Sequence, residues 1–223
     1  MATMVTSTKP VTKKGAGGGS KFPGPNGNGK RNGHDLFQPD PKANRYRVGT
    51  WVGLASVAML FTALSSAYIV RAGASTDWVT ITMPRVLILS TVLILISSVT
   101  MEISRRNLKQ SSLSGYGRWL LITMLLGLGF LASQLVAWRQ LARQGVYVAT
   151  NPHSSFFYLL TAAHAVHLGG GLLALIFLWT RSRFLTETKV TAQRLAAADA
   201  VTIYWHFMDA LWIYLFLLLF LWR

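Results

Sequence analysis

Cysteine is absent from this chain of 223 residues. Its absence excludes a disulfide, a Cys-ligated zinc or iron–sulfur site, a C-x-x-C-H haem attachment and thiolate ligands for a copper centre within the chain. The sequence also has no P-loop, dinucleotide-binding fingerprint or nucleophile motif. We therefore expect no catalytic residue and no metal ligand in this chain.

Acidic residues are scarce, with 7 Asp and Glu against 22 Lys and Arg, and the net charge is +15. Such a charge is typical of nucleic-acid-binding proteins, but here the basic residues lie in the first 47 residues and between apolar runs. That distribution follows membrane topology, so we expect no nucleic-acid partner. Residues 1–47 are rich in Gly, Lys, Pro, Asn and Ser, which predicts a disordered basic tail rather than a secretory signal.

Apolar sequence is abundant, since 52% of the residues are hydrophobic. A membrane-spanning helix needs about 20 mostly apolar residues, and five continuous stretches are long enough. The predicted fold is therefore an all-α membrane protein, with five transmembrane helices in a bundle over residues 48–223. The expected spans are 48–70, 85–104, 117–138, 155–180 and 199–222.

The basic residues also predict how the bundle is oriented. With the N-terminus inside, seventeen Lys and Arg lie on the cytoplasmic side and five on the other side. An excess of Lys and Arg marks the cytoplasmic side of membrane proteins. We therefore expect a cytoplasmic N-terminus and a periplasmic C-terminus.

Two pairs of ionisable residues lie deep inside the last two spans. His164 and His167 are three residues apart, as are His206 and Asp209, so each pair shares one side of its helix. One interpretation is ligation of haem iron or copper by the imidazoles. The other is hydrogen bonding between helices, which we favour because histidines three apart on one helix suit a single haem poorly.

Two further polar residues lie in the second and third spans. Glu102 could relay protons, but Arg105 and Arg106 follow it at i+3 and i+4, which favours a local ion pair. Gln134 lies in the middle of its span. We expect its amide to hydrogen-bond to another helix, because an unpaired amide in lipid is costly.

Two motifs carry a family resemblance. Residues 156–171 read FFYLLTAAHAVHLGGG, and residues 204–212 read YWHFMDALW. Both resemble the last two helices of subunit III of the haem-copper respiratory oxidases. Weaker matches precede them in the family's order, such as a SAY motif at 66–68 and Gln134 after a Leu-Gly-x-x-Phe pattern.

The resemblance implies a non-catalytic subunit III of a cytochrome c oxidase-type complex, which reduces O2 to water and pumps protons. It implies that haems and copper lie in partner subunits and that this chain holds neither. The expected role is to stabilise subunit I and to support proton uptake and O2 access, with bound phospholipid, in the bacterial inner membrane. Subunit I is the main expected partner, followed by subunit II; subunit IV and a respiratory supercomplex are further candidates.

The resemblance also assigns roles to residues. Arg118 and Trp205 become candidates for contact with lipid headgroups. The residues expected to form a polar core for packing within and between subunits are His164, His167, His206, Asp209, Gln134 and Glu102.

The sequence departs from the family at two positions. Val57 and Ala137 stand where many members have a membrane-buried glutamate, which puts the carboxylate roles in proton uptake or regulation in doubt here. Five spans also fit quinol oxidase subunit III, and an accessory subunit of nitric oxide reduction shares the pattern. A more distant alternative is a haem b cytochrome with ligands from His164 or His167 and His206.

Overall fold

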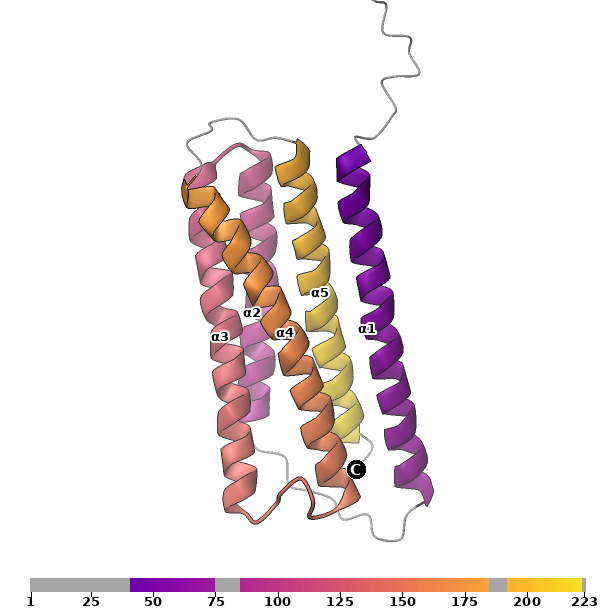
Figure 1. Ribbon diagram of the computed structural model, residues 1–223. Coiled ribbons are helices and arrows are strands. Elements are labelled where there is room, and N and C mark those ends of the chain that lie inside the picture. Colours follow the sequence, from indigo (N-terminus) through magenta and orange to yellow (C-terminus); the bar gives the residue numbers. More distant parts are fainter. Residues whose placement is uncertain (1–40, 75–84, 185–191, 222–223) are drawn as a thin grey trace, which may run out of the picture. The chain divides into compact units, whose positions relative to one another are not determined.

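The computed structural model describes residues 41–74, 85–184 and 192–221, so the expected tail before residue 41 lies outside it. Within those ranges the chain forms five α-helices and no strand, as predicted (Figure 1). All five are long and apolar enough to cross a membrane. Their bounds are α1 Pro41–Ala74, α2 Val86–Lys109, α3 Leu113–Arg143, α4 Pro152–Phe184 and α5 Ala192–Leu221.

All five helices are longer than the apolar spans expected from the sequence. The first helix begins at Pro41, seven residues before the expected start at Val48, so the last part of the expected tail is helical. Proline is favourable in the first turn of a helix because its missing N–H would have no partner there. α3 likewise extends beyond its expected span at both ends. A helix satisfies its backbone internally, so it can continue past the hydrocarbon into the headgroup region.

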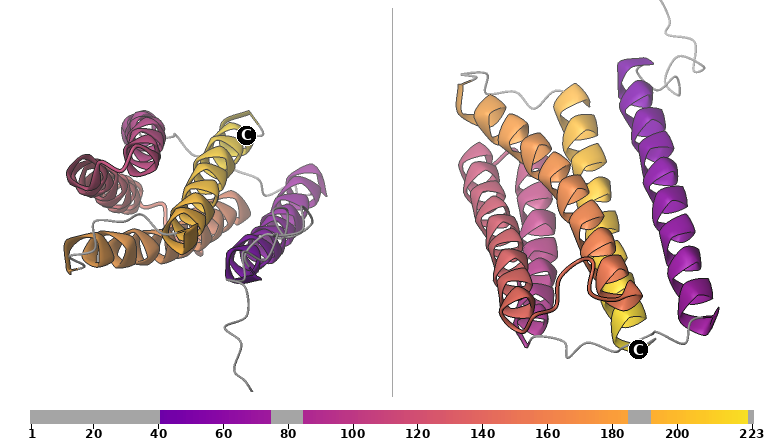
Figure 2. Two further views of the ribbon diagram at one scale, coloured as in Figure 1. Left: turned by 90° about the horizontal axis from the view of Figure 1, so that it is seen from above. Right: turned by 60° about the horizontal axis from the view of Figure 1, so that its bottom comes forward.

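α4 and α5 each contact three other helices of the described bundle: α5 contacts α1, α2 and α4, and α4 contacts α1, α3 and α5. α2 and α3 form an antiparallel hairpin with the most extensive contact of any pair, and α3 also packs on α4. α1 contacts α4 and α5 but neither α2 nor α3 (Figure 2). α1 and α2 thus lie along α5 without touching each other.

Two helices end in the same backbone turn, with the residue after the cap in the left-handed region. Ser111 follows α2 with a φ of 61°, and Gly145 follows α3 with a φ of 78°. The next amides, of Ser112 and Val146, each donate to a carbonyl five residues earlier, at 2.9 and 3.0 Å. This is the Schellman arrangement, which satisfies the last carbonyls of a helix.

The core surrounds two tryptophans of α5, Trp205 and Trp212, which are spaced seven residues apart and fully buried. Glycines on two neighbouring helices leave room for Trp205. A Cβ on Gly127 of α3 would lie 2.8 Å from its Cη2 atom, and one on Gly171 of α4 would lie 3.4 Å from its Cε3 atom. A side chain at position 127 would therefore clash with the indole, whereas one at position 171 would be tight against Tyr204 at 3.1 Å.

Candidate functional site

The two core tryptophans join α5 to α2 through their indole N–H groups. Trp205 donates to the hydroxyl of Ser97, and Trp212 donates to that of Thr91, each at 3.1 Å. A buried tryptophan normally finds a partner for its N–H, because an unpaired donor in an apolar interior is costly. These bonds fix the register of two antiparallel helices.

A second set of contacts joins the same two helices. It includes the residue after Ser97 on α2 and the residue after Trp205 on α5. The Ser98 hydroxyl and the Nδ1 atom of His206 lie 2.6 Å apart, and Arg105 donates to Asp199 at 3.1 Å. In this second set the spacing is seven residues on each helix, about two turns. His206 thus contacts a hydroxyl of another helix, and we call these four residues the outer row.

Hydroxyl groups also join α2 to α3. Ser90, Ser97 and Ser104 recur every seven residues on α2 and are all fully buried. The pairs across the hairpin are Ser90 with Ser133 at 2.7 Å, Thr100 with Thr123 at 2.8 Å, and Ser104 with the carbonyl of Tyr116 at 3.1 Å. The buried face of α2 thus carries hydroxyl groups along its length, interspersed with apolar residues such as Ile94 and Met101.

His164 is enclosed by aromatic rings from three other helices. Ring centroids lie at 6.4 Å for Phe61, 5.8 Å for Phe130 and 5.2 Å for Trp212. Neither ring nitrogen makes a hydrogen bond to the described residues, so the interhelical bond predicted for His164 is not present. Its contribution is the packing of a flat, polarisable ring between α1, α3 and α5.

His167 bonds within its own helix instead of across helices. Its Nδ1 atom donates to the carbonyl of Ala163 at 2.7 Å, since a carbonyl can only accept. The link to α5 comes from Tyr204, whose hydroxyl donates to the His167 carbonyl at 2.8 Å. The imidazole of His167 is therefore positioned by its own helix, α4, and its backbone carbonyl is bonded to Tyr204 of α5.

Gln134 and Asp209 are both buried. Both amide atoms of Gln134 are unpaired among the described residues, whereas the Asp209 carboxyl lies beside Ser98, the hydroxyl that also meets His206. The interhelical bond predicted for Gln134 is therefore wrong for the chain on its own. The mid-span position predicted burial, but it could not predict whether a partner lies within reach.

Glu102 forms the ion pairs predicted for it. Its carboxylate accepts from Arg105 at 2.8 Å and from Arg106 at 3.1 Å. Arg105 also reaches Asp199, so the pair becomes a network between α2 and α5. The spacing of charges on α2 predicted the first contact, while the link to α5 requires the fold.

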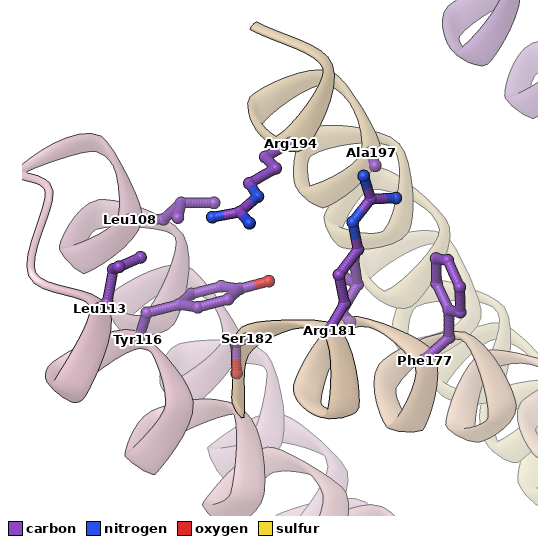
Figure 3. A pocket seen from close by; sticks show the side chains of 9 residues that line it. Leu108, Leu113, Tyr116, Phe177, Arg181, Ser182, Arg194 and Ala197 are labelled. Atoms are coloured by element: carbon purple, nitrogen blue, oxygen red, sulfur yellow. The ribbon is translucent and has the colours of Figure 1, made fainter. Parts of the chain in front are cut away.

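The two lipid candidates lie in different environments. Arg118 is exposed near the start of α3, where a headgroup could reach it. Trp205 is fully buried and bonded to Ser97, so its described contacts are with protein, in contrast to the expected lipid contact. A separate hollow at the same end holds the Tyr116 hydroxyl and the guanidinium groups of Arg181 and Arg194 (Figure 3).

The role that this arrangement supports is structural, because its buried polar contacts hold the helices in place relative to one another. Within residues 41–74, 85–184 and 192–221, no three His, Cys, Asp or Glu side chains gather closely enough to hold a metal ion. Sequence reasoning missed the bonds made by the tryptophans, Tyr204 and the buried hydroxyls. The signal that could have found them is the seven-residue repeat shared by polar residues of α2 and by Trp205 and Trp212 of α5.

The fold and this network define a multi-pass helical membrane protein whose polar residues bond between helices. The family described as cytochrome c oxidase subunit III matches residues 44–223, which include nearly all of the five helices.

Individual relatives agree with that match. A Mycobacterium leprae protein named "Probable cytochrome c oxidase subunit 3" is 34% identical, over 82% of this chain and 89% of its own length. The cytochrome c oxidase subunit 3 of Corynebacterium diphtheriae is 31% identical, over 79% and 87%. The quinol oxidase subunit 3 of Bacillus spizizenii is 27% identical, over 76% and 83%. The chain belongs to the cytochrome c oxidase subunit III family of haem-copper oxidases.

Proposed function

We propose that this chain is the non-catalytic subunit III of a cytochrome c oxidase, that it stabilises subunit I during turnover, and that it supports proton uptake and O2 access. The observation that carries the proposal is the family match over residues 44–223. Relatives named for cytochrome c oxidase are 31–35% identical, while those named for quinol oxidase are 27% identical, which favours the cytochrome c form.

The polar side chains support a structural role in the complex. His206 and the ion pairs of Glu102 bond between or along helices, and His164 is enclosed by aromatic rings. None of these contacts leaves a side chain poised for group transfer. We assign His164, His167, His206, Asp209, Gln134 and Glu102 to packing within the bundle or against a neighbouring subunit.

The finer assignments follow the same proposal. The haems and copper belong to the partner subunits, chiefly subunits I and II, and this chain contributes none of their ligands. Arg118, exposed near one end of α3, is the proposed contact for a phospholipid headgroup. The membrane is the bacterial inner membrane, and the N-terminus faces the cytoplasm because the basic connections lie on that side.

The test is purification of the tagged chain in a mild detergent, with identification of co-purifying subunits and a reduced-minus-oxidised absorbance spectrum. We expect a haem-copper subunit I to co-purify, and the haem bands to leave with it when the complex is dissociated. Haem bands that stay with the separated chain would make it a cytochrome instead. Co-purification with nitric oxide reductase subunits would favour the accessory alternative.

A further inference from the structure

The outer row of α2 and α5 is only partly covered by this chain. Side chains of Arg105 and Asp199 are 31% and 39% exposed, and Ser98 and His206 are also partly exposed. Lipid tails cannot hydrogen-bond, so polar groups at membrane depth normally face protein or water. The partly exposed row therefore marks a face of the bundle that differs from its lipid-facing sides.

His206 lies well inside the membrane along its helix. It is fourteen residues after Ala192, the first residue of α5, which places it about 21 Å along the helix. The 30-residue helix is about 45 Å long, compared with about 30 Å of hydrocarbon, so the imidazole lies below the headgroups. A partly exposed imidazole at that depth would be costly against acyl chains.

A groove runs over the same face at the end where α5 begins. It is lined by Asp199 and Ile203 of α5, by Trp51 of α1 and by Arg105 of α2. The groove exists because α1 and α2 both contact α5 but do not contact each other. Trp51 and Ile203 are exposed, so its apolar parts are open to a neighbour. Asp199 and His206 lie on one stripe of α5, which places the outer row beside this groove.

We propose that the groove between α1 and α2 seats a membrane-spanning helix of another oxidase subunit, and that this helix presents a hydrogen-bonding side chain to the Ser98–His206 pair. The proposal rests on the proposed function, because that function supplies the neighbouring subunit. A helix fits the site chemically, since it can offer both apolar side chains to Ile203 and a polar group to His206. A phospholipid chain offers only the first.

Charge argues against a second copy of this chain as the occupant. Arg47, Arg105, Arg106 and Lys109 outnumber Glu102 and Asp199 around the groove's charged end. A two-fold contact would bring these like charges together, because both partners would present the same surface. The expected partner helix therefore carries acidic side chains or free carbonyls at its cytoplasmic end.

The test is site-specific photo-cross-linking in membranes that contain the whole complex. A benzophenone amino acid replaces Ile203 in the groove or, as the control, Leu173 on α4. Both are exposed aliphatic residues, and each lies eleven residues from the same end of the bundle, measured from Ala192 and from Phe184. We expect position 203 to cross-link to another subunit and position 173 to give lipid adducts.

The chemical identity of the cross-linked adduct at position 203 shows which molecule occupies the groove. Lipid adducts alone at position 203, or a cross-linked pair of this chain, would overturn the proposal. If subunit I still co-purifies in that case, the proposed function stands and only this surface is wrong. If no other oxidase subunit co-purifies, the proposed function is overturned whatever the cross-linking result. The docking proposal, which rests on that function, then falls with it.

A bulky substitution gives a second measurement that does not depend on cross-linking yield. Ile203→Trp fills the groove, whereas Leu173→Trp adds the same side chain to an exposed site at matched depth. We expect the first variant to lower retention of the chain in the purified complex about tenfold and the second to leave retention unchanged. Equal retention of the two variants would contradict the proposal. Tryptophan fluorescence of each purified chain shows that both still fold.

Discussion

At the residue scale, the limited space around the Trp205 indole restricts which substitutions the bundle tolerates. Trp205 lies between Gly127 of α3 and Gly171 of α4, and its N–H is bonded to Ser97 of α2. Three helices therefore meet at one side chain of α5. Overpacking such a centre forces side chains or backbone to shift, which typically costs about 1–3 kcal/mol.

Gly127→Ala should destabilise the bundle. The added Cβ would lie 2.8 Å from the Trp205 ring and 3.1 Å from Leu172, so α3 must move away. We expect a loss of about 1–3 kcal/mol in an SDS titration of the purified chain, followed by tryptophan fluorescence. Gly129→Ala is the matched control, because its Cβ would meet Leu93 at an ordinary 3.8 Å. A similar midpoint for both variants would contradict the packing argument.

Sequence reasoning worked at single residues where the partner is local. Glu102 was predicted from arginines three and four positions away, and these contacts are present. It failed for Gln134 and His164, whose partners would have to come from other helices. The amide and the imidazole are buried as expected, but burial alone does not say which side chain of a neighbouring helix lies within about 3 Å.

At the element scale, the number of helices could be predicted, because each apolar run exceeds the length needed to cross the hydrocarbon. Helix ends were predicted less well. α1 begins at Pro41, and α3 extends from Leu113 to Arg143, because charged and polar residues can continue a helix beyond the apolar part. Hydropathy predicts which part of a helix lies in the hydrocarbon, whereas the ends of the helix are set by caps and turns.

The two Schellman turns give a paired prediction. Ser111→Gly should stabilise the chain by about 0.5–1 kcal/mol, because glycine adopts a positive φ without a Cβ penalty. Gly145→Ala should destabilise it by about 1–2 kcal/mol, although no atom lies within 4 Å of the new Cβ. The midpoint of SDS unfolding measures both.

Gly169→Ala in α4 is the control for the second substitution. It also has open space around its Cβ but lacks a positive φ. Alanine in a helix should be neutral or favourable there. Equal loss of stability at positions 145 and 169 would show that backbone conformation is not the cause.

At the scale of the whole molecule, the order in which helices pack could not be predicted. All five spans are apolar nearly all round, so hydropathy does not reveal which face meets which neighbour. The indole and hydroxyl bonds between α2 and α5 settle one contact, and the hydroxyl pairs between α2 and α3 settle another. Among the described residues, the backbones of α1 and α2 do not come into contact, and the groove between them follows from that.

Orientation is the remaining whole-molecule property, and the absence of cysteine makes it directly measurable. Ser112→Cys lies in the exposed connection between α2 and α3, and Ala149→Cys lies in that between α3 and α4. With the N-terminus inside, a membrane-impermeant maleimide should label position 149 in intact spheroplasts and position 112 only after permeabilisation. The opposite pattern would place the charged end of the α1–α5–α2 groove outside. It would also leave seventeen basic residues on the outer side, against the charge rule that motivates the assignment.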